Sequence, residues 1–142
     1  MRLWRLYRRA HGPGLDGAGG RYAEGRWHRL GTPVVYFGAG AAIVVLERLA
    51  HLNADALPDD LILARFEGEL SVEALDRRDL GSLDKTRELG QQWIERKSSC
   101  VLQVPSVIVP EESNLVLNPG HAQAATLRLI EERPFVFDDR LV

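Results

Sequence analysis

The sequence predicts an α+β fold in which strands outnumber helices. Strand-like segments are numerous along the chain, and helix-like segments are few. The two kinds do not alternate regularly, which argues against a doubly wound parallel sheet. The 142 residues are enough for one domain with its own core and leave little room for a second. We therefore expect a single compact domain over residues 1–142, with a mixed or antiparallel sheet and a few helices.

The first half of the chain contains two predicted strands and one predicted helix. Residues 3–8 (LWRLYR) alternate bulky apolar and basic side chains, the pattern of a half-buried strand. Residues 33–37 (PVVYF) carry a β-branched run that ends before Gly38, which indicates a short buried strand. Residues 39–52 are long enough and rich enough in alanine and leucine for a helix, and most of that helix should be buried.

The second half is predicted to be mostly strand. The segment 83–97 has the apolar stripe and the charged face of an amphipathic helix. Pro105 should form a bulge or a break within the strand-like segment that contains it. Strands are predicted at residues 60–67, 100–110, 114–121 and 125–138, where 114–121 ends in a turn and 125–138 closes the sheet.

A glycine-rich loop after the first predicted strand contains the pattern G-x-G-x-x-G. Residues 12–17 (GPGLDG) match the turn that binds a pyrophosphate in dinucleotide-binding folds. That turn must open a helix, yet the segment 18–33 is dense in glycine and has no helical apolar spacing. We interpret residues 12–17 as part of a flexible, turn-rich loop and not as a Rossmann fingerprint.

The composition indicates a soluble protein with an uneven charge distribution. Hydrophobic residues make up 45% and charged residues 27% of the chain, and the net charge is −2. The first thirty residues nevertheless contain seven arginines against two acidic residues. An acidic chain is a poor candidate for direct nucleic-acid binding, which requires a basic face. Most of these arginines should be solvated, and one or two of them could bind a small anionic ligand.

Other classes are disfavoured by what the sequence lacks. The single cysteine, Cys100, allows no intramolecular disulfide and fits a reducing compartment. The chain shows no signal peptide and no apolar run long enough to span a membrane, so we expect a cytoplasmic protein without membrane contact. No metal site is expected, because the four histidines lack metal-ligand spacing; they are His11, His28, His51 and His121.

Two polar residues stand out within apolar segments. Glu47 lies in the predicted helix 39–52, where a carboxylate beside an apolar face is disfavoured unless it is paired or functional. The alternative is a solvated position paired with His51, four residues later. Ser106 lies between apolar residues and prolines, where a serine most often bonds to nearby backbone. The residues alone leave both readings of Glu47 open.

Two blocks of the chain resemble the RES domain, the toxin of a bacterial toxin–antitoxin pair. The first, residues 25–52, has a Gly-Arg-Trp turn, a Gly-Thr-Pro entry, a strand that carries Tyr36, and a helix with Glu47 eleven residues later. The second, residues 104–121, has Pro-Ser, then Pro, then Asn, then Asn-Pro-x-His. Residues 3–8 are similar to the family's first strand, so the resemblance covers essentially the whole chain.

The resemblance implies a set of site residues and an ADP-ribosyltransferase-like fold. The family is named for an arginine, a glutamate and a serine, which here correspond to Arg26, Glu47 and Ser106. Tyr36 matches the family's site tyrosine, and Arg5 matches an arginine of the first strand. A departure occurs at residue 28, where histidine stands in place of the common asparagine, and we assign it no function.

The implied reaction breaks the bond between nicotinamide and ribose in NAD, with water or inorganic phosphate as acceptor. Glu47 would stabilise an oxocarbenium-like transition state through a ribose hydroxyl. Arg5 and Arg26 would hold the pyrophosphate, and Tyr36 would stack on nicotinamide. Ser106 would orient Arg26 or Glu47, or bind the ribose. NAD is then a substrate, no other cofactor is expected, and inorganic phosphate is a possible co-substrate.

The resemblance also implies partners and leaves alternatives. The family pairs with Xre-type helix-turn-helix antitoxins and forms toxin homodimers within the larger complex. A protein mono-ADP-ribosyltransferase would use the same NAD site and add a side-chain acceptor. A binding module without activity is disfavoured, because Arg26, Tyr36, Glu47 and Ser106 are all present.

Overall fold

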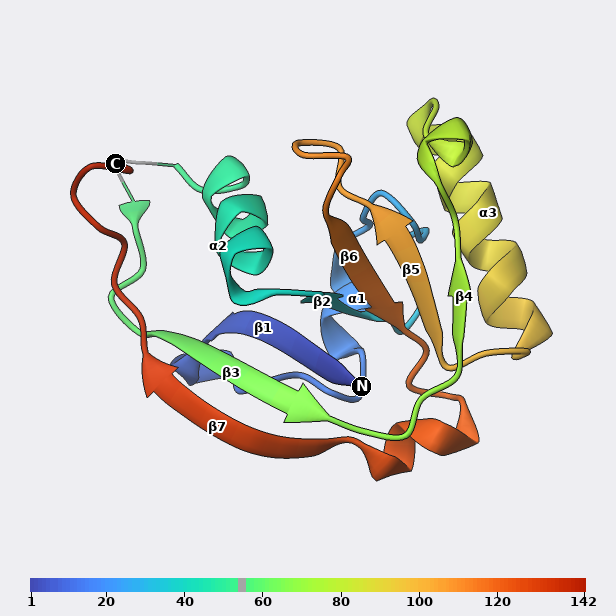
Figure 1. Ribbon diagram of the computed structural model, residues 1–142, viewed down its shortest axis with the longest axis horizontal. Coiled ribbons are helices and arrows are strands. Elements are labelled where there is room, and N and C mark those ends of the chain that lie inside the picture. The colour runs from blue at the N-terminus through green and yellow to red at the C-terminus, as the bar shows by residue number, and fades with distance from the viewer. Residues whose placement is uncertain (54–55) are drawn as a thin grey trace.

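One seven-stranded sheet organises the structure, a computed structural model that describes residues 1–53 and 56–142 (Figure 1). The strand order is β4-β5-β6-β2-β1-β3-β7. The strands are β1 (Arg2–Arg8), β2 (Val35–Gly38), β3 (Leu61–Glu67), β4 (Val72–Ala74), β5 (Val101–Pro105), β6 (Ser113–Leu117) and β7 (Arg128–Pro134). The α-helices are α1 (Ala18–Tyr22), α2 (Ala41–Ala50) and α3 (Leu83–Arg96), and short 3₁₀ helices lie at Arg9–His11, Arg77–Asp79 and Ala122–Thr126.

The sheet is mixed, which confirms the predicted fold class. The short edge strand β4 runs parallel to β5, and the other neighbouring strands pair antiparallel. β1 and β2 are joined through a single residue pair, Trp4 with Gly38, whereas β1 pairs with β3 along its whole length. The sheet therefore opens between β1 and β2, and this opening separates a β1–β3–β7 half from a β2–β6–β5–β4 half.

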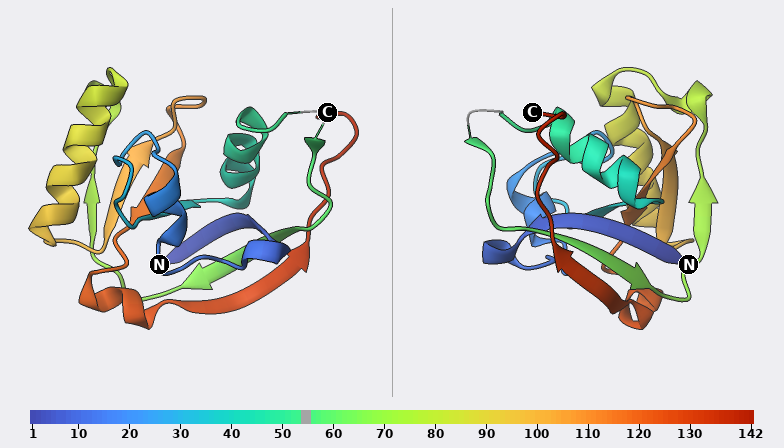
Figure 2. Two further views of the ribbon diagram at one scale, coloured as in Figure 1. Left: turned by 180° about the vertical axis from the view of Figure 1, so that it is seen from behind. Right: turned by 60° about the vertical axis from the view of Figure 1, so that its left-hand side comes forward.

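Helices α2 and α3 cover the same face of the sheet, one over each half (Figures 1 and 2). Directly paired residues share a face, so Trp4, Gly38, Asn114 and Val104 lie on one side. On the β1 half, α2 packs Val44 and its neighbours against Trp4 and other apolar side chains of this face.

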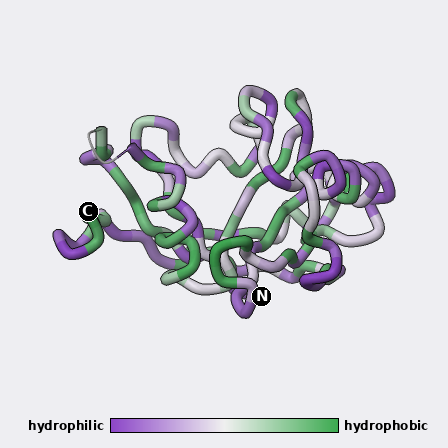
Figure 3. The backbone as a smooth tube through the Cα atoms, turned by 90° about the horizontal axis from the view of Figure 1, so that it is seen from above, coloured by the Kyte–Doolittle hydropathy of each residue, from purple (hydrophilic) through white to green (hydrophobic). Residues whose placement is uncertain are grey.

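On the other half, α3 supplies Trp93, which packs against Leu102 and Val116 and is 1% exposed. Most of the residues of α3 are hydrophilic, as the colour of the tube in Figure 3 shows. The region between α2 and α3 on this face is therefore flanked by two packed apolar clusters.

The opposite face carries the largest apolar cluster, which spans both halves of the sheet. It includes Leu3 of β1, Phe37 of β2, Phe66 of β3 and Leu115 of β6. Leu15 of the glycine-rich loop packs against it. Seen from behind in Figure 2, the blue segment that contains α1 lies across these central strands. Within the described residues, no helix has the length and hydrophobicity needed to cross a membrane.

The helices and most strands follow the sequence prediction, and three segments differ. Residues 107–110 form a turn and not a strand, because β5 ends at Pro105. The strand β4 is only three residues long and was not predicted. The glycine-rich segment contains the five-residue helix α1, so its interpretation as an irregular loop was wrong there.

The pattern GPGLDG is nevertheless not a Rossmann fingerprint. The strand before it, β1, pairs antiparallel with both of its neighbours, whereas the fingerprint belongs to a parallel βαβ unit. The helix after it has a single turn and follows Gly17. The antiparallel pairing supports the interpretation of residues 12–17 as a connecting loop.

Gly90 allows α3 to approach the loop that contains Arg26 and Trp27. A Cβ at position 90 would lie 1.7 Å from the Trp27 carbonyl oxygen and 2.6 Å from its carbonyl carbon. Both are backbone atoms, so neither can swing aside as a flexible side chain would. Glycine at this position therefore determines how closely the loop can lie on the helix.

We predict that Gly90→Ala lowers the free energy of unfolding by about 3 kcal/mol, because an overpacked contact forces the backbone to move. Thermal and chemical unfolding would measure the loss. The matched control is Gly19→Ala in α1, where a Cβ meets no atom within 4 Å and stability should not fall. Equal stability of the Gly90→Ala protein and the wild type would contradict the close approach.

Candidate functional site

The Glu47 carboxylate is held by two side chains: Ser106, which directly follows the end of β5, and Asn114, which lies at the start of β6. Its Oε1 accepts a hydrogen bond from the Ser106 hydroxyl at 2.7 Å and another from the Asn114 amide Nδ2 at 2.9 Å. Both donors bind the same oxygen, so Oε2 remains available to a ligand. Glu47 is partly exposed, and its pairing with His51 is not observed: the His51 ring bonds to the Glu47 backbone carbonyl instead.

Helix α2 reaches this position because the chain turns sharply after β2. A Cβ at Gly38, the last residue of β2, would lie 3.0 Å from side-chain atoms of Ile43 and Val44. Glycine therefore allows α2 to fold back closely over the sheet. Asn114 pairs with Gly38 across the β2–β6 ladder, so the start of α2 and the Asn114 side chain lie on the same face.

Ser106 has a structural role and contacts the site at the same time. It is fully buried, and its hydroxyl accepts hydrogen bonds from the amides of Ile108 and Val109, both at 3.1 Å. These bonds close the turn that replaces the predicted strand at 107–110. The same hydroxyl donates its proton to Glu47, so among the predicted roles the structure favours orientation of Glu47.

Tyr36 is fixed at its hydroxyl by the turn that carries Arg26. The Trp27 amide donates to the Tyr36 hydroxyl at 3.2 Å, and His28 Nδ1 lies 2.7 Å from it. His28 Nε2 lies 2.8 Å from the Ala23 carbonyl oxygen and must carry the ring proton. Nδ1 therefore accepts the hydroxyl proton of Tyr36. Burial raises the pKa of Tyr36, so the phenol is neutral at physiological pH.

Arg26 presents a guanidinium that no described residue engages. Its backbone carbonyl accepts a hydrogen bond from the Thr86 hydroxyl of α3 at 2.6 Å, which fixes the turn against the helix. Its side chain has no hydrogen-bond or ion-pair partner in the described part of the chain. Its positive charge, together with that of Arg87, opposes part of the burial effect on the pKa of Tyr36, so Arg26 lies near that ring.

Arg5 fills the opening of the sheet between β1 and β2. Its Nη1 donates to the Tyr36 carbonyl oxygen and its Nε to the Pro13 carbonyl oxygen, both at 2.7 Å. Its guanidinium also lies 5.8 Å from the Phe37 ring centroid. Two of its nitrogens are thus committed to backbone, which sequence reasoning did not anticipate, and Nη2 has no such bond.

Tyr36, Glu47 and Ser106 form one connected patch on the face between α2 and α3, and the Arg26 turn is bonded to it. Arg5 alternates with Trp4 on β1, so its side chain leaves the sheet on the opposite face, beside Phe37. Tyr36 and Asn114 are diagonal neighbours on adjacent strands, a relation that corresponds to about 7–8 Å. Asn114 then links to Glu47 and through it to Ser106, while the Tyr36 backbone and hydroxyl link to Arg5 and to the Arg26 turn.

Asn114 and His28 are the residues that sequence reasoning missed. Asn114 was part of the family resemblance without an assigned role, and His28 was noted only as a departure from the family pattern. Two features of the structure identify them. The Asn114 amide lies beside a carboxylate, and the His28 imidazole is 2% exposed and bonded at both nitrogens.

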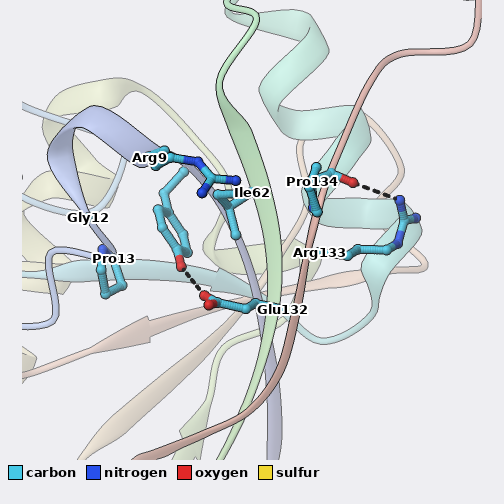
Figure 4. Close-up of a pocket in the computed structure, with 8 residues that line it drawn as sticks. Arg9, Gly12, Pro13, Ile62, Glu132, Arg133 and Pro134 are labelled. Carbon is cyan, nitrogen blue, oxygen red and sulfur yellow. Dashed lines mark hydrogen bonds between the residues drawn. The ribbon is translucent and has the colours of Figure 1, made fainter.

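Two cavities lie outside this patch. One of about 290 Å³ opens among β1, β3, β7 and the Gly12–Pro13 segment, where the Tyr7 hydroxyl donates to Glu132 at 2.9 Å (Figure 4). A second, of about 280 Å³, lies between Trp4, the start of α2 and β7. Neither is lined by Arg26, Tyr36, Glu47 or Ser106. No group of metal-ligating side chains is found in residues 1–53 and 56–142.

The patch is suited to a ligand that carries hydroxyl groups, an aromatic ring and negative charge. A carboxylate oxygen with a fixed position can accept from hydroxyls, and an unpaired guanidinium can bind phosphate with two parallel hydrogen bonds. The hydroxyl of Tyr36 is used internally, so its ring can serve a ligand only as a stacking surface.

Comparisons with known proteins identify the family of the chain and agree with its fold. The model of the RES domain family matches residues 2–138. "Toxin Res" of Pseudomonas putida is 35% identical over 148 residues, covering 99% of each chain. "Prs ADP-ribosylating toxin" of a Sphingobium species is 34% identical over 142 residues, covering 90% of this chain and 86% of that protein.

A solved structure has the same fold. It is the crystal structure of the Mycobacterium tuberculosis MbcT–MbcA toxin–antitoxin complex, matched with a TM-score of 0.76 and 18% identity over 94% of this chain and 83% of the other. At that identity the likeness concerns the fold alone. The family match spans nearly the whole chain and the relatives are similar over almost their full lengths, and so the protein belongs to the RES domain family.

Proposed function

We propose that this protein is the toxin of a toxin–antitoxin pair and that it depletes NAD by cleaving the bond between nicotinamide and ribose. The observation that carries the proposal is the Glu47 carboxylate, with Oε1 held by Ser106 and Asn114 and Oε2 left for a ligand. The names of the relatives, toxins of which one is ADP-ribosylating, support it.

Glu47 acts on the charge that develops at the ribose. As the C1′–N bond stretches, its electron pair moves to the pyridinium nitrogen and positive charge builds on C1′ and the ring oxygen. Oε2 accepts a hydrogen bond from a ribose hydroxyl and opposes that charge. Because the two donors already hold the carboxylate, little reorganisation is needed during the reaction.

The leaving group and the acceptor place few demands on the protein. Nicotinamide departs as a neutral molecule, so no general acid is required. A water oxygen then bonds to C1′ and loses a proton to solvent, which gives ADP-ribose. Inorganic phosphate in the same position gives ADP-ribose that carries a phosphate on that same carbon. NAD is thus a substrate, and the proposed chemistry uses no further cofactor.

Three further side chains serve the dinucleotide in this proposal. Arg26, whose guanidinium has no partner in the described residues, holds the pyrophosphate. The Tyr36 ring stacks on nicotinamide, and its anchored hydroxyl keeps the ring orientation constant. Arg5 contributes positive charge and its Nη2, while its other bonds hold the glycine-rich loop and β2.

A second candidate is a protein mono-ADP-ribosyltransferase that uses the same site. The Sphingobium relative, named as an ADP-ribosylating toxin, favours it. NAD labelled in its adenosine half separates the candidates in one assay with cell extract and with inorganic phosphate. Label in free ADP-ribose or its phosphate supports NAD cleavage, and label retained on protein supports transfer.

The proposed partner is a helix-turn-helix antitoxin of the Xre type, bound to a homodimer of this chain in the cytoplasm. The fold is shared with the toxin of a solved toxin–antitoxin complex, which supports a protein partner. Co-expression with the gene that neighbours this one, followed by purification and mass measurement of the complex, tests the partner and the stoichiometry together.

We predict that Glu47→Gln reduces the rate constant of NAD cleavage by about 100- to 1,000-fold, the usual effect of removing one electrostatic contact to a transition state. The glutamine oxygen can still accept from Ser106 and Asn114, so the fold should persist. The readouts are NAD consumption, growth on expression and thermal unfolding. The control is Glu95→Gln on the exposed surface of α3. Wild-type turnover by folded Glu47→Gln protein would exclude Glu47 from the reaction.

Arg26→Lys should impair NAD cleavage strongly although it preserves charge. A lysine ammonium is a point charge and cannot make the two parallel bonds that a guanidinium makes to phosphate. Steady-state kinetics should show a rise in KM for NAD of about tenfold or more. The matched control, Arg21→Lys, changes an exposed arginine. A normal KM in the Arg26→Lys protein would place the pyrophosphate elsewhere.

Ser106→Ala should lower kcat with little change in KM, because Ser106 acts by orienting Glu47 and not by touching NAD. In a Glu47→Gln background the same change should cost much less, since the oriented charge is already absent. A double-mutant cycle on kcat measures this difference. Full additivity of the two losses would assign Ser106 a role independent of Glu47.

A further inference from the structure

The Arg26 turn, residues 25–28, is fastened to α3 through its backbone carbonyl groups. The Gly25 carbonyl accepts a hydrogen bond from Arg87 Nε at 2.8 Å. The Arg26 carbonyl accepts one from the Thr86 hydroxyl at 2.6 Å. Two neighbouring side chains of one helix therefore hold two neighbouring carbonyl groups of the turn.

The next helical turn of α3 continues this contact. Gly90 lies four positions after Thr86 and so on the same face of the helix, where only glycine leaves room for the Trp27 carbonyl. The Gln91 side-chain oxygen accepts a hydrogen bond from the Arg29 amide at 3.1 Å, directly after the Arg26 turn. One face of α3 thus contacts the turn along its whole backbone.

Thr86 and Arg87 are withdrawn from solvent although both are polar. Thr86 is fully buried, and the Arg87 side chain is 20% exposed, whereas the other charged side chains of α3 are exposed. A buried polar group lowers stability unless it is hydrogen-bonded. The bond to the Arg26 carbonyl is the shortest that the Thr86 hydroxyl makes, and Arg87 Nη1 also lies 3.5 Å from the Glu24 carboxylate. Because Thr86 is inaccessible, it can affect a ligand only through the turn.

The opposite side of the Arg26 turn holds Tyr36. The Trp27 amide donates to the Tyr36 hydroxyl at 3.2 Å. A Cβ at Gly25 would lie 2.6 Å from the same hydroxyl, so the turn and the phenol are in close contact. A displacement of the turn would therefore move the Arg26 side chain and the anchor of the Tyr36 ring together.

The Glu47 carboxylate is held by a different part of the chain. Its donors are Ser106 and Asn114, and the Ser106 hydroxyl is fixed in turn by the amides of Ile108 and Val109. None of these four hydrogen bonds involves α3 or the Arg26 turn. The site therefore has two halves with separate supports.

We propose that Thr86 and Arg87 are positioning residues, which place the Arg26 guanidinium and the Tyr36 ring for substrate binding without affecting Glu47. The inference rests on the proposed function for its substrate, because Arg26 and Tyr36 contact NAD there. Loss of either positioning residue should weaken the binding of NAD and leave the rate constant of bond cleavage nearly unchanged.

Steady-state kinetics on NAD tests this division. Thr86→Val removes the hydroxyl and keeps the shape, and Arg87→Met removes the donors and keeps the length. Both should raise KM by about three- to tenfold, as expected for one lost hydrogen bond, with little change in kcat. Thr86→Ser keeps the hydroxyl and should keep the wild-type KM. The matched control is Arg96→Met, an exposed arginine of the same helix, which should change neither parameter.

Double-mutant cycles distinguish positioning from a direct contact between Arg87 and NAD. In an Arg26→Lys background, Arg87→Met should raise KM much less than in the wild type, because Arg87 acts through the turn. In a Ser106→Ala background it should have its full effect, since the two halves are independent. Full additivity with Arg26→Lys would overturn the proposal, and so would a loss in kcat as large as the rise in KM.

Amide hydrogen exchange without NAD separates this inference from the proposed function. The Trp27 amide, which is bonded to the Tyr36 hydroxyl, should exchange faster in both variants than in the wild type. The Ser106 amide, bonded to a backbone carbonyl at 2.9 Å, should keep its wild-type rate. Unchanged exchange at Trp27 overturns the positioning role, and equally faster exchange at both amides overturns it as well, because the effect is then global. A wild type that does not consume NAD would refute the proposed function, while exchange at Trp27 still decides whether α3 holds the turn.

A milder variant keeps the test valid if Arg87→Met folds poorly. Arg87→Lys preserves the charge, but its ammonium replaces the fork that reaches the Gly25 carbonyl and Glu24 together. Its KM and its exchange rate at Trp27 should lie between those of the wild type and Arg87→Met. Wild-type values of both in folded Arg87→Lys and Thr86→Val proteins would overturn the proposal.

Discussion

The arrangement of the site depends on the two hydrogen bonds that hold Glu47 Oε1. They join α2 to the end of β5 and the start of β6, across separations of 59 and 67 residues. A carboxylate on a partly exposed helix would otherwise rotate freely among its rotamers. Two donors on one oxygen select a single orientation of the carboxylate and leave the other oxygen without a hydrogen bond to the described residues. The position of Ser106 depends in turn on the β5–β6 pairing and on the turn that its own hydroxyl closes.

The opening of the sheet between β1 and β2 adds the second constraint. Only Trp4 and Gly38 pair there, so the Tyr36 carbonyl finds its hydrogen bond in Arg5 and not in a neighbouring strand. The same guanidinium holds the Pro13 carbonyl and thereby the glycine-rich loop. A cation is thus built into the sheet at the opening between β1 and β2, where it bonds backbone carbonyls of both β2 and the loop.

The fold could be predicted where local patterns are strong. Alternation in 3–8 and 60–67 and the amphipathic pattern in 83–97 agree with β1, β3 and α3. The prediction was wrong where tertiary contacts decide. Residues 107–110 are rich in β-branched side chains, a composition typical of a strand. The Ser106 hydroxyl nevertheless accepts hydrogen bonds from the Ile108 and Val109 amides, and the segment forms a turn. β4 has three residues, too few to show an alternating pattern in the sequence. It forms because the edge of β5 is free to pair with it.

The sequence by itself determined the fold class and the order of the main elements and, through the RES resemblance, predicted a set of site residues: Arg5, Arg26, Tyr36, Glu47 and Ser106. Only the tertiary structure decided what each of them touches. It showed that Glu47 pairs with Ser106 and Asn114 and not with His51, that His28 holds the Tyr36 hydroxyl, and that Arg48 has a buried nitrogen without a partner. The reason is geometric. Periodicity reports contacts a few residues apart, whereas the Glu47 contacts join segments 59 and 67 residues apart, which are brought together by strand pairing and helix packing.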